Sequence, residues 1–358
     1  MRAWGVWEGL RTRRRAGSIQ QPKECLYYSQ MAKFGYTLLC EQRSPVDLVR
    51  EGRAAEAAGF DFAVISDHFH PWLDAQGHSP FAWSVLGALA EVTERMELMT
   101  MVTCPTMRYH PAIVAQMAAT IAVMSGGRFQ LGVGSGENLN EHVVGGGWPT
   151  AGIRHEMLTE AIEIMRRLWE GGLQDFQGEH FELADARLYT LPEWPIRIHV
   201  AAGGPETARL AGEFGDGLIA TEPSTGIVQE FLKAGGQGRP CYGQVAVCYD
   251  ESEERALATA HALWRFSVPG WKVMAELPNP VNLEAATKTV RPEDVAELVS
   301  YGPDPERHLA GIRRFLDAGF DHVAIVQVGQ NQDGFLRFWR EELRPRLERA
   351  AAPSAAAP

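Results

Sequence analysis

The 358-residue sequence has no apolar run long enough to cross a membrane and no excess of basic residues. A spanning helix needs about 20 consecutive apolar residues, so we expect no transmembrane segment. Asp and Glu number 45 against 34 Lys and Arg, which gives a formal net charge of -11. A surface of that charge repels the phosphate backbone of nucleic acids. We therefore expect a protein that binds neither membranes nor nucleic acids.

Cysteine is scarce and dispersed, with five residues in the chain and no C-x-x-C pair. This pattern argues against a disulfide framework and against a zinc site built on cysteines, and it favours a reducing cytoplasm. Three histidines, His68, His70 and His78, lie close together in the sequence. Metal-binding histidines usually come with converging carboxylates, and the spacing here matches no recognised ligand set, so we predict no metal site.

Signatures of two large enzyme classes are also missing. The chain contains no G-x-S-x-G, the motif that carries the nucleophile of many serine hydrolases. The glycines of Gly132–Gly136 (GVGSG) are not the dinucleotide-binding fingerprint, because the third glycine follows the second by two positions and not by three. Without an activated nucleophile, the remaining polar residues favour proton transfer beside a bound cofactor that carries out the redox step.

The sequence does contain a repeated unit, which is a short apolar strand, a polar or glycine-rich turn and an amphipathic helix. Nearly all-apolar strands are typical of a parallel sheet covered on both faces. The predicted strands are Phe34–Leu39, Phe60–Ser66, Met96–Thr103, Phe129–Gly134, Ile196–Ala201, Gly217–Thr221, Gln244–Cys248 and His322–Val328. The fold class is therefore α/β, either a (β/α)8 barrel or a doubly wound open sheet. The count of eight strands favours the TIM barrel.

Two internal segments and both chain ends depart from this repeat. Residues 175–189 (DFQGEHFELADARLY) predict a surface hairpin, and residues 266–291 predict a long irregular loop that serves as a lid or a substrate wall. Residues 1–30 are rich in arginine, and we expect a disordered extension or translation from a start upstream of the true one at Met31. Residues 349–358 are expected to be a low-complexity tail. Residues 31–348 then form a single barrel domain.

The ends of the predicted strands carry the polar residues of interest, since barrel enzymes hold their active sites at the carboxyl ends of the strands. His68 follows the second strand beside Asp67, and a histidine titrates near neutral pH. Glu41 follows the first strand, and Glu137 stands in the glycine-rich loop after the fourth. The pair Gly203–Gly204 opens a helix after the fifth strand, which predicts either a plain turn or an anion site at the helix N-terminus.

Several strings of residues resemble the bacterial luciferase-like superfamily. They are Phe60–Trp72 (FDFAVISDHFHPW), Cys104–Ala112 (CPTMRYHPA), Leu131–Glu141 (LGVGSGENLNE), Val200–Pro205 (VAAGGP) and Gly215–Gly217 (GDG). Within it the chain is similar to the branch of F420-dependent oxidoreductases around glucose-6-phosphate dehydrogenase, from about Lys33 to Leu347. The resemblance implies a TIM barrel with insertion segments, a homodimer, and hydride exchange between the deazaflavin coenzyme F420 and a small-molecule substrate.

The resemblance also implies roles for individual residues. Asp67 contacts the coenzyme, His68 handles the substrate proton, Trp72 packs at the reacting centre, and Glu137 serves the coenzyme ring nitrogen as acid or base. Glu41 matches a family glutamate near the active site. Other positions match coenzyme contacts, and these are Cys104, Ser135, Gly136, Asn140, Gly203, Gly204, Glu206 and Thr207. The family has a non-proline cis peptide bond in its third strand, which corresponds to a position near Met101-Val102.

The positions that hold the sugar phosphate in that branch are largely changed here. A threonine of that branch matches Thr221, but its lysine three residues later is replaced by Ser224. Two further cationic residues of that branch align near Ala285 and Leu298, which carry no charge. Lys288 is close to the former of these two positions and could substitute in part. A buried phosphate dianion without charge partners is costly, so we expect an alcohol or carbonyl substrate and not glucose 6-phosphate. Two alternatives are an FMN-dependent luciferase-like monooxygenase and a non-catalytic barrel that only binds the coenzyme.

Overall fold

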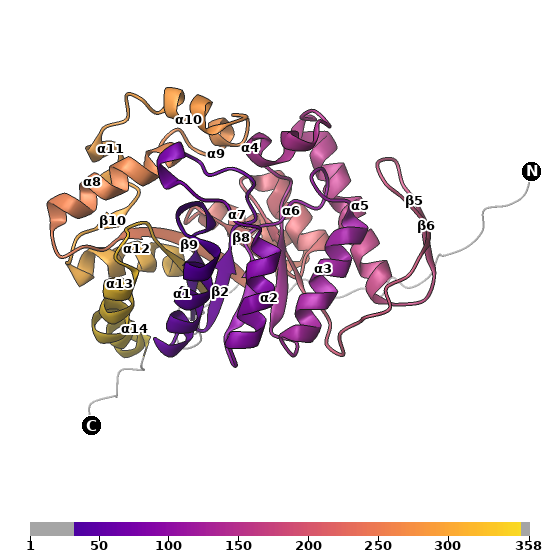
Figure 1. Cartoon of the computed structure of the whole chain (residues 1–358), viewed down its shortest axis with the longest axis horizontal. Helices are drawn as coiled ribbons and strands as arrows, with labels where there is room; N and C mark the ends of the chain where they lie inside the picture. The colour runs from indigo at the N-terminus through magenta and orange to yellow at the C-terminus, as the bar shows by residue number, and fades with distance from the viewer. Residues whose placement is uncertain (1–31, 352–358) are drawn as a thin grey trace, which may run out of the picture.

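Eight parallel strands close into a barrel in the computed structural model of the chain, which describes residues 32–351 (Figure 1). The barrel strands are β1 Lys33–Leu38, β2 Phe62–Ile65, β3 Glu97–Thr100, β4 Phe129–Val133, β7 Ile198–Ala201, β8 Gly217–Ala220, β9 Cys241–Cys248 and β11 His322–Gln327. Each pairs in parallel with the next in this order, and β11 returns to pair with β1. This closure confirms the (β/α)8 barrel and all eight predicted strands, and it excludes the open sheet.

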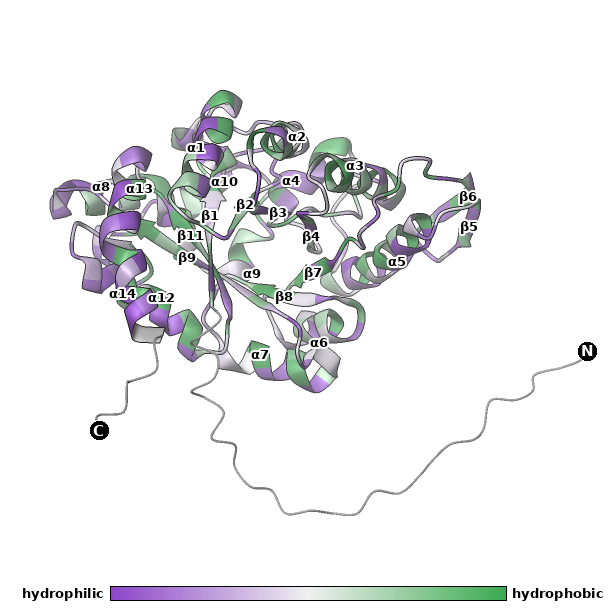
Figure 2. Ribbon diagram, turned by 90° about the horizontal axis from the view of Figure 1, so that it is seen from below, coloured by the Kyte–Doolittle hydropathy of each residue, from purple (hydrophilic) through white to green (hydrophobic). Residues whose placement is uncertain are grey.

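The strands bury both of their faces, which explains their apolar composition. One face fills the inside of the barrel, where Phe62 and Tyr242 pack edge to face with ring centroids 5.5 Å apart. The other face packs against the surrounding helices in the largest hydrophobic cluster. Figure 2 shows hydrophobic residues on the central strands and hydrophilic residues on rim helices such as α12 and α14. The inside of the barrel is therefore a packed core.

A ring of helices surrounds the strands. They are α1 Pro45–Ala57, α2 Ala82–Val92, α3 Pro111–Met124, α5 Ala151–Trp169, α6 Pro205–Phe214, α7 Thr225–Phe231, α12 Pro305–Asp317, α13 Gln332–Phe338 and α14 Arg344–Ala351. Capping residues start α1, because the Ser44 hydroxyl accepts a hydrogen bond from the backbone N–H of Asp47 and Pro45 is the first helical residue. The chain leaves α1 through Gly59, whose φ of +89° favours glycine.

The two predicted insertions have different outcomes. The hairpin is confirmed as β5 Gln174–Gln177 and β6 Glu182–Ala186. The segment predicted as an irregular loop at 266–291 is instead built from short helices, which corrects that prediction. Within it lie α9 Trp271–Met274 and α10 Pro280–Ala286. The element α8 Glu253–Trp264 precedes it, and α11 Pro292–Ala296 and the short strand β10 Ser300–Tyr301 follow it. Capping residues such as Asn279, followed by Pro280, start these short helices.

These short helices lie together with α4 Asn138–Glu141 at one end of the barrel (Figure 1). The expected extension at residues 1–30 lies outside the described residues. Helix α14 continues to Ala351, and the rest of the expected tail, residues 352–358, also lies outside them. Across residues 32–351, no helix combines the length and apolar character that a membrane span requires.

Candidate functional site

A buried ion pair between His68 and Glu41 lies at the carboxyl ends of β1 and β2. The Nδ1 atom of His68 is 3.0 Å from a carboxylate oxygen of Glu41, and both side chains are more than nine-tenths buried. The other carboxylate oxygen of Glu41 accepts a hydrogen bond of 2.9 Å from the Ser66 hydroxyl. Two residues predicted from separate strand ends are thus brought into contact. The contact at Nδ1 leaves the Nε2 atom of His68 for a substrate.

The pair holds His68 in its charged form at neutral pH. Burial by itself lowers the pKa of His68, but the carboxylates of Glu41 and Glu137 outweigh burial and raise this pKa to about 9. Burial likewise raises the pKa of Glu41, but the attraction of His68 and hydrogen bonds to it hold this pKa below its usual value. The imidazole of His68 therefore carries a transferable proton at the end of the barrel formed by the carboxyl ends of the strands, which we call the barrel mouth.

An aromatic wall stands beside His68. Trp72 packs edge-on against the His68 ring, with ring centroids 5.0 Å apart. Its other neighbour is Phe266, which stacks on it at 4.9 Å and nearly parallel. Trp264 in turn lies 4.9 Å from Phe266. The wall joins the loop after β2 to the segment after α8, so the apolar surface next to the proton-bearing ring comes from two distant parts of the sequence.

Asp67 is held by donors from within the protein. One of its carboxylate oxygens accepts from Trp83 Nε1 at 3.1 Å and from the Thr103 hydroxyl at 2.8 Å. The other lies 3.1 Å from the Tyr109 hydroxyl and 3.2 Å from Arg108 Nη2. Four donors match the roughly four acceptor sites of a carboxylate. The Asp67 side chain therefore organises the loop after β3.

Arg108 is the main residue that sequence reasoning did not single out. Its guanidinium contacts Asp67, and its Nε atom lies 3.8 Å from a carboxylate oxygen of Glu141, while its backbone N–H donates to the other oxygen at 3.0 Å. All three side chains are more than nine-tenths buried. Burial raises the pKa of Glu141 to about 7 despite Arg108. The sequence signal that could have identified Arg108 was its position in the string CPTMRYHPA, which follows a predicted strand.

The glycine-rich loop after β4 is fastened to the His68 loop through Asn140. The side-chain oxygen of Asn140 accepts from the backbone N–H groups of Phe69 and His70, and its amide donates to Glu137 at 3.2 Å. Asn140 is fully buried, and its side chain makes all three of these hydrogen bonds to groups of the protein itself. The predicted residues His68 and Glu137 are thus positioned by a common buried amide.

The loop also approaches the end of β3 closely. Gly136 has a φ of +83°, and a Cβ added there would lie 2.8 Å from the Cys104 sulfur. Ser135 precedes this turn and is partly exposed. The peptide bond Met101-Val102 is cis, as the resemblance implied. Cys104 is buried, its sulfur lies 3.1 Å from the Thr106 hydroxyl, and burial raises the pKa of its thiol, so it is no thiolate nucleophile.

The pair Gly203–Gly204 lies at the start of α6, where the sequence predicts either a plain turn or an anion site, and we call this turn the cradle. Gly204 is the N-cap residue, Pro205 is the first helical residue, and the Thr207 hydroxyl donates to the carbonyl of Gly204. A Cβ added at Gly204 would meet no atom within 4 Å, whereas one added at Gly203 would lie 2.7 Å from the Trp271 ring. Glu206 is exposed in the first turn. A side chain therefore has room at Gly204, whereas at Gly203, which is exposed, it would meet Trp271 of α9.

Residues 31–322 match the model of a protein family that is described as Luciferase-like monooxygenase. The chain belongs to the luciferase-like family. F420-dependent glucose-6-phosphate dehydrogenase 1 of Rhodococcus jostii (strain RHA1) is 38% identical to it over 331 residues, which are 88% of this chain and 98% of that protein. The F420-dependent glucose-6-phosphate dehydrogenase of Tsukamurella paurometabola is 37% identical over 338 residues, 88% of this chain and 99% of that protein.

Solved structures agree with this family. An F420-dependent secondary alcohol dehydrogenase in complex with an F420-acetone adduct superposes with a TM-score of 0.82 and is 29% identical. The match covers 87% of this chain and 98% of that chain. The resemblance drawn from the sequence motifs is therefore confirmed at the level of the family and the fold, and the similar proteins are oxidoreductases.

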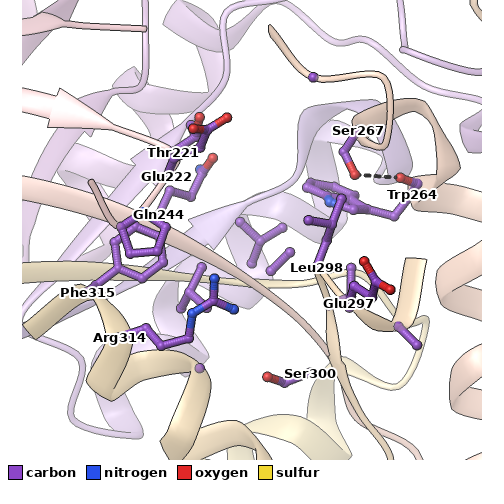
Figure 3. A pocket seen from close by; sticks show the side chains of 18 of the residues that line it. Thr221, Glu222, Gln244, Trp264, Ser267, Glu297, Leu298, Ser300, Arg314 and Phe315 are labelled. Carbon is purple, nitrogen blue, oxygen red and sulfur yellow. Dashed lines mark hydrogen bonds between the residues drawn. The ribbon is translucent and has the colours of Figure 1, made fainter. Parts of the chain in front are cut away.

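A cavity of about 1000 Å³ opens beside the aromatic wall of this luciferase-like protein. Of the predicted site residues, only Trp72 and Thr221 line it, and Figure 3 shows Thr221 beside Glu222 in this lining. Ser224 and Leu298, two of the positions that the resemblance aligns with phosphate-binding cations, also line it, and Ala285, which lies on α10, does not. Within residues 32–351, no group of three or more His, Cys, Asp or Glu side chains is placed to hold a metal ion.

Proposed function

We propose that this luciferase-like protein is an F420-dependent oxidoreductase that interconverts an alcohol and a carbonyl compound. The buried Glu41–His68 pair beside Trp72 carries the proposal, because it stores one transferable proton at the barrel mouth. The similarity of the chain to F420-dependent dehydrogenases supports the choice of coenzyme. When bound, coenzyme F420 accepts or supplies the hydride at its deazaflavin ring.

His68 moves the substrate proton in this proposal. In the direction of carbonyl reduction, the charged imidazole donates its Nε2 proton to the carbonyl oxygen. In the direction of alcohol oxidation, the neutral imidazole accepts the hydroxyl proton at the same nitrogen. Glu41, fixed by Ser66, holds the ring orientation through Nδ1 and stabilises the charged form. Trp72 closes one side of the reacting space against water.

The cradle and the glycine-rich loop fit an elongated coenzyme that carries negative charge. Gly204 leaves open space at the N-terminus of α6, where free backbone N–H groups and the helix dipole favour an anion. We assign the backbone atoms of four residues to the binding of the negatively charged end of the coenzyme, and these are Gly203, Gly204, Glu206 and Thr207. Ser135, Gly136 and Cys104 would face the coenzyme from the loop, with Glu137 at its ring nitrogen. Asp67 and Asn140 act as positioning residues, because their side chains are engaged within the protein.

Replacement of Gly204 by valine tests the cradle. A side chain here meets no protein atom at its Cβ, so the fold should be retained, while the space for the coenzyme is filled. We expect F420 binding to weaken at least tenfold, about 1.4 kcal/mol, in a fluorescence titration. Gly226→Val, at another uncrowded glycine away from the cradle, is the control. An unchanged dissociation constant would remove Gly204 from the site, and tighter binding of FMN than of F420 would favour the monooxygenase alternative.

Glucose 6-phosphate should be a poor substrate. The lysine position of the sugar-phosphate branch is Ser224, and Leu298, which is half exposed, stands where an arginine was expected. Glu222 also lines the cavity and repels a phosphate. Steady-state assays that follow F420 absorbance should show little turnover of glucose 6-phosphate and higher turnover of neutral secondary alcohols. Efficient turnover of the sugar phosphate would contradict this assignment.

We also propose that the chain forms a homodimer through α2 and α3. Exposed apolar side chains gather on and beside these helices, and they are Phe81, Val92, Ile113, Val123 and Met124. Exposed apolar clusters of this kind are typical of protein interfaces. Light scattering should give twice the mass of one chain, and Phe81→Glu together with Ile113→Glu should give the single-chain mass. A wild-type mass of one chain would contradict the proposal.

The cytoplasm is the location that we propose. Cys40, Cys104, Cys241 and Cys248 are free and buried. Burial raises the pKa of each of these thiols, so they remain protonated and unreactive. Free thiols of this kind are usual in a reducing compartment.

A further inference from the structure

One edge of β9 is unpaired over its middle. β8 pairs with Cys241–Gly243, and β10 pairs with Val247 and Cys248 on the same side. Between them, no strand of the described chain pairs with Gln244–Ala246 on this edge, although β11 pairs along the whole opposite edge. The wall of the barrel therefore has a gap between β8 and β10.

The large cavity extends through this gap. Successive residues of a strand point to opposite faces. The cavity is lined by Gln244 and Ala246, on the same face of β9 as the interior residue Tyr242, and also by Val245 on the other face. It continues to Arg314 and Phe315 of α12, which covers the outside of the barrel. Figure 3 shows Arg314 and Phe315 on the opposite side of the cavity from Trp264. The cavity is thus a passage from the mouth of the barrel to its flank.

The two ends of the passage differ in character. At the mouth it reaches Trp72, which packs against His68. Its middle is lined by apolar side chains such as Phe266 and Leu298, and Leu298 remains 49% exposed. An exposed leucine that faces a cavity favours an apolar ligand that would cover it.

A free cation marks the outer end. Among the described residues, the Arg314 guanidinium makes no ion pair and no hydrogen bond, whereas Arg307 in the same lining pairs with Glu253 and donates to the Tyr301 carbonyl. Glu222 and Glu297 also line the cavity, but neither pairs with Arg314 (Figure 3). Arg314 is exposed and, among the described residues, is the cation of this lining without a carboxylate partner, so it would hold the anion. Glu222 and Glu297 repel a phosphate dianion about twice as strongly as a carboxylate, so the lining disfavours the phosphate more.

We infer that the passage binds the far end of an elongated substrate, whose apolar chain ends in a carboxylate held by Arg314. This inference rests on the proposed function, since it places the reacting alcohol or carbonyl at His68. It names the substrate class as long-chain hydroxy or keto acids. The apolar chain would cover the exposed Leu298, and the carboxylate would supply the partner that Arg314 lacks.

Isothermal titration of the coenzyme-free protein with two ligands tests the inference. The ligands are a long-chain keto acid with its ketone next to the methyl end, and the methyl ketone of equal chain length without the carboxylate. We expect the keto acid to bind the wild type about tenfold or more tightly than the ketone, and Arg314→Gln to abolish this preference. The matched control is Arg313→Gln, because Arg313 is the adjacent residue of α12, pairs with Glu306 and does not line the cavity.

A second variant tests the passage itself. Ala310 lies on α12, is exposed and lines the cavity, so Ala310→Phe should narrow the passage without disturbing the core. It should weaken binding of both long ligands and leave turnover of a short secondary alcohol unchanged. Equal affinity of the two ligands for the wild type, or an unchanged preference in Arg314→Gln, would overturn the inference. So would a loss of F420 affinity in Arg314→Gln with the preference intact, because the passage would then serve the coenzyme.

The outcomes also separate this inference from the proposed function. If the keto acid binds with the expected dependence on Arg314 but F420-loaded wild type never converts it or any other carbonyl, the proposed function fails and the passage assignment stands. If wild type converts ketones with F420 but Arg314 has no influence on the keto acid, the passage assignment fails and the proposed function stands.

Discussion

Replacement of His68 by alanine should lower kcat by about 10²–10⁴, the usual contribution of a general acid or base. The variant removes the imidazole that is buried against Glu41 at the barrel mouth, and with it the proton that this imidazole carries. F420 affinity should change little, because the cradle at Gly204 and the glycine-rich loop are untouched. Single-turnover measurement of F420 absorbance, with coenzyme affinity measured separately, gives both quantities.

His70→Ala is the matched control for this variant. The His70 ring faces His142, and its backbone N–H, which donates to Asn140, is retained in the alanine variant. We therefore expect activity within a few-fold of the wild type. Equal losses in the two variants, or a loss that follows unfolding in a thermal melt, would show that the loop as a whole and not the His68 imidazole is required. A His68→Ala rate near that of the wild type would move the proton to Glu41 or Glu137.

The pH dependence checks the same residue in another way. With a His68 pKa of about 9, alcohol oxidation needs the neutral ring and should accelerate as the pH rises through that value. Carbonyl reduction needs the charged ring and should slow above it. In Glu41→Gln the carboxylate that raises the pKa of His68 is gone, and burial then lowers this pKa. The pH dependences of alcohol oxidation and of carbonyl reduction should therefore both move to lower pH. A rate reduction without such a shift would indicate that Glu41 has only a packing role.

The barrel could be predicted from the sequence because its signals are local. Each strand is a short apolar run with an abrupt end, and helix starts such as Ser44-Pro45 are encoded by capping residues. The segment at 266–291 was predicted as a loop, because its helices are too short for an amphipathic period to emerge. α9 and α10 have four and seven residues, about one or two turns each.

The site was predictable in position but less so in detail. Strand ends and family motifs identified His68, Glu41 and Glu137, and the structure brings the first two into contact. The internal engagement of Asp67 and Asn140 depends on donors far away in the sequence, such as Trp83, and these pairings leave no local pattern. The passage through the barrel wall depends on where β8 and β10 stop along β9, which is a property of strand register and not of residue type.

Replacement of Arg108 by methionine should destabilise the protein by about 3–5 kcal/mol, which is the usual effect of breaking a buried ion pair from one side. The variant takes the cation away from both buried carboxylates, Asp67 and Glu141, although Asp67 keeps its bonds from Trp83, Thr103 and Tyr109. We expect Tm to fall by roughly 5–10 °C in calorimetry at neutral pH. Arg167→Met, which breaks a half-exposed pair with Glu163, should cost at most about 1 kcal/mol.

The pH dependence of this loss identifies its cause. Burial already raises the pKa of Glu141 to about 7, so the folded protein binds this proton more readily than the unfolded chain does. Glu141 therefore lowers stability as the pH rises from its unfolded pKa towards 7, and without Arg108 its pKa should rise further. The part of the Tm deficit of Arg108→Met that comes from Glu141 should accordingly shrink as the pH is lowered from 8 to about 5, and Glu141→Gln should recover that part at about pH 8. A deficit that is constant with pH and unaffected by Glu141→Gln would show that Arg108 stabilises the loop by packing alone.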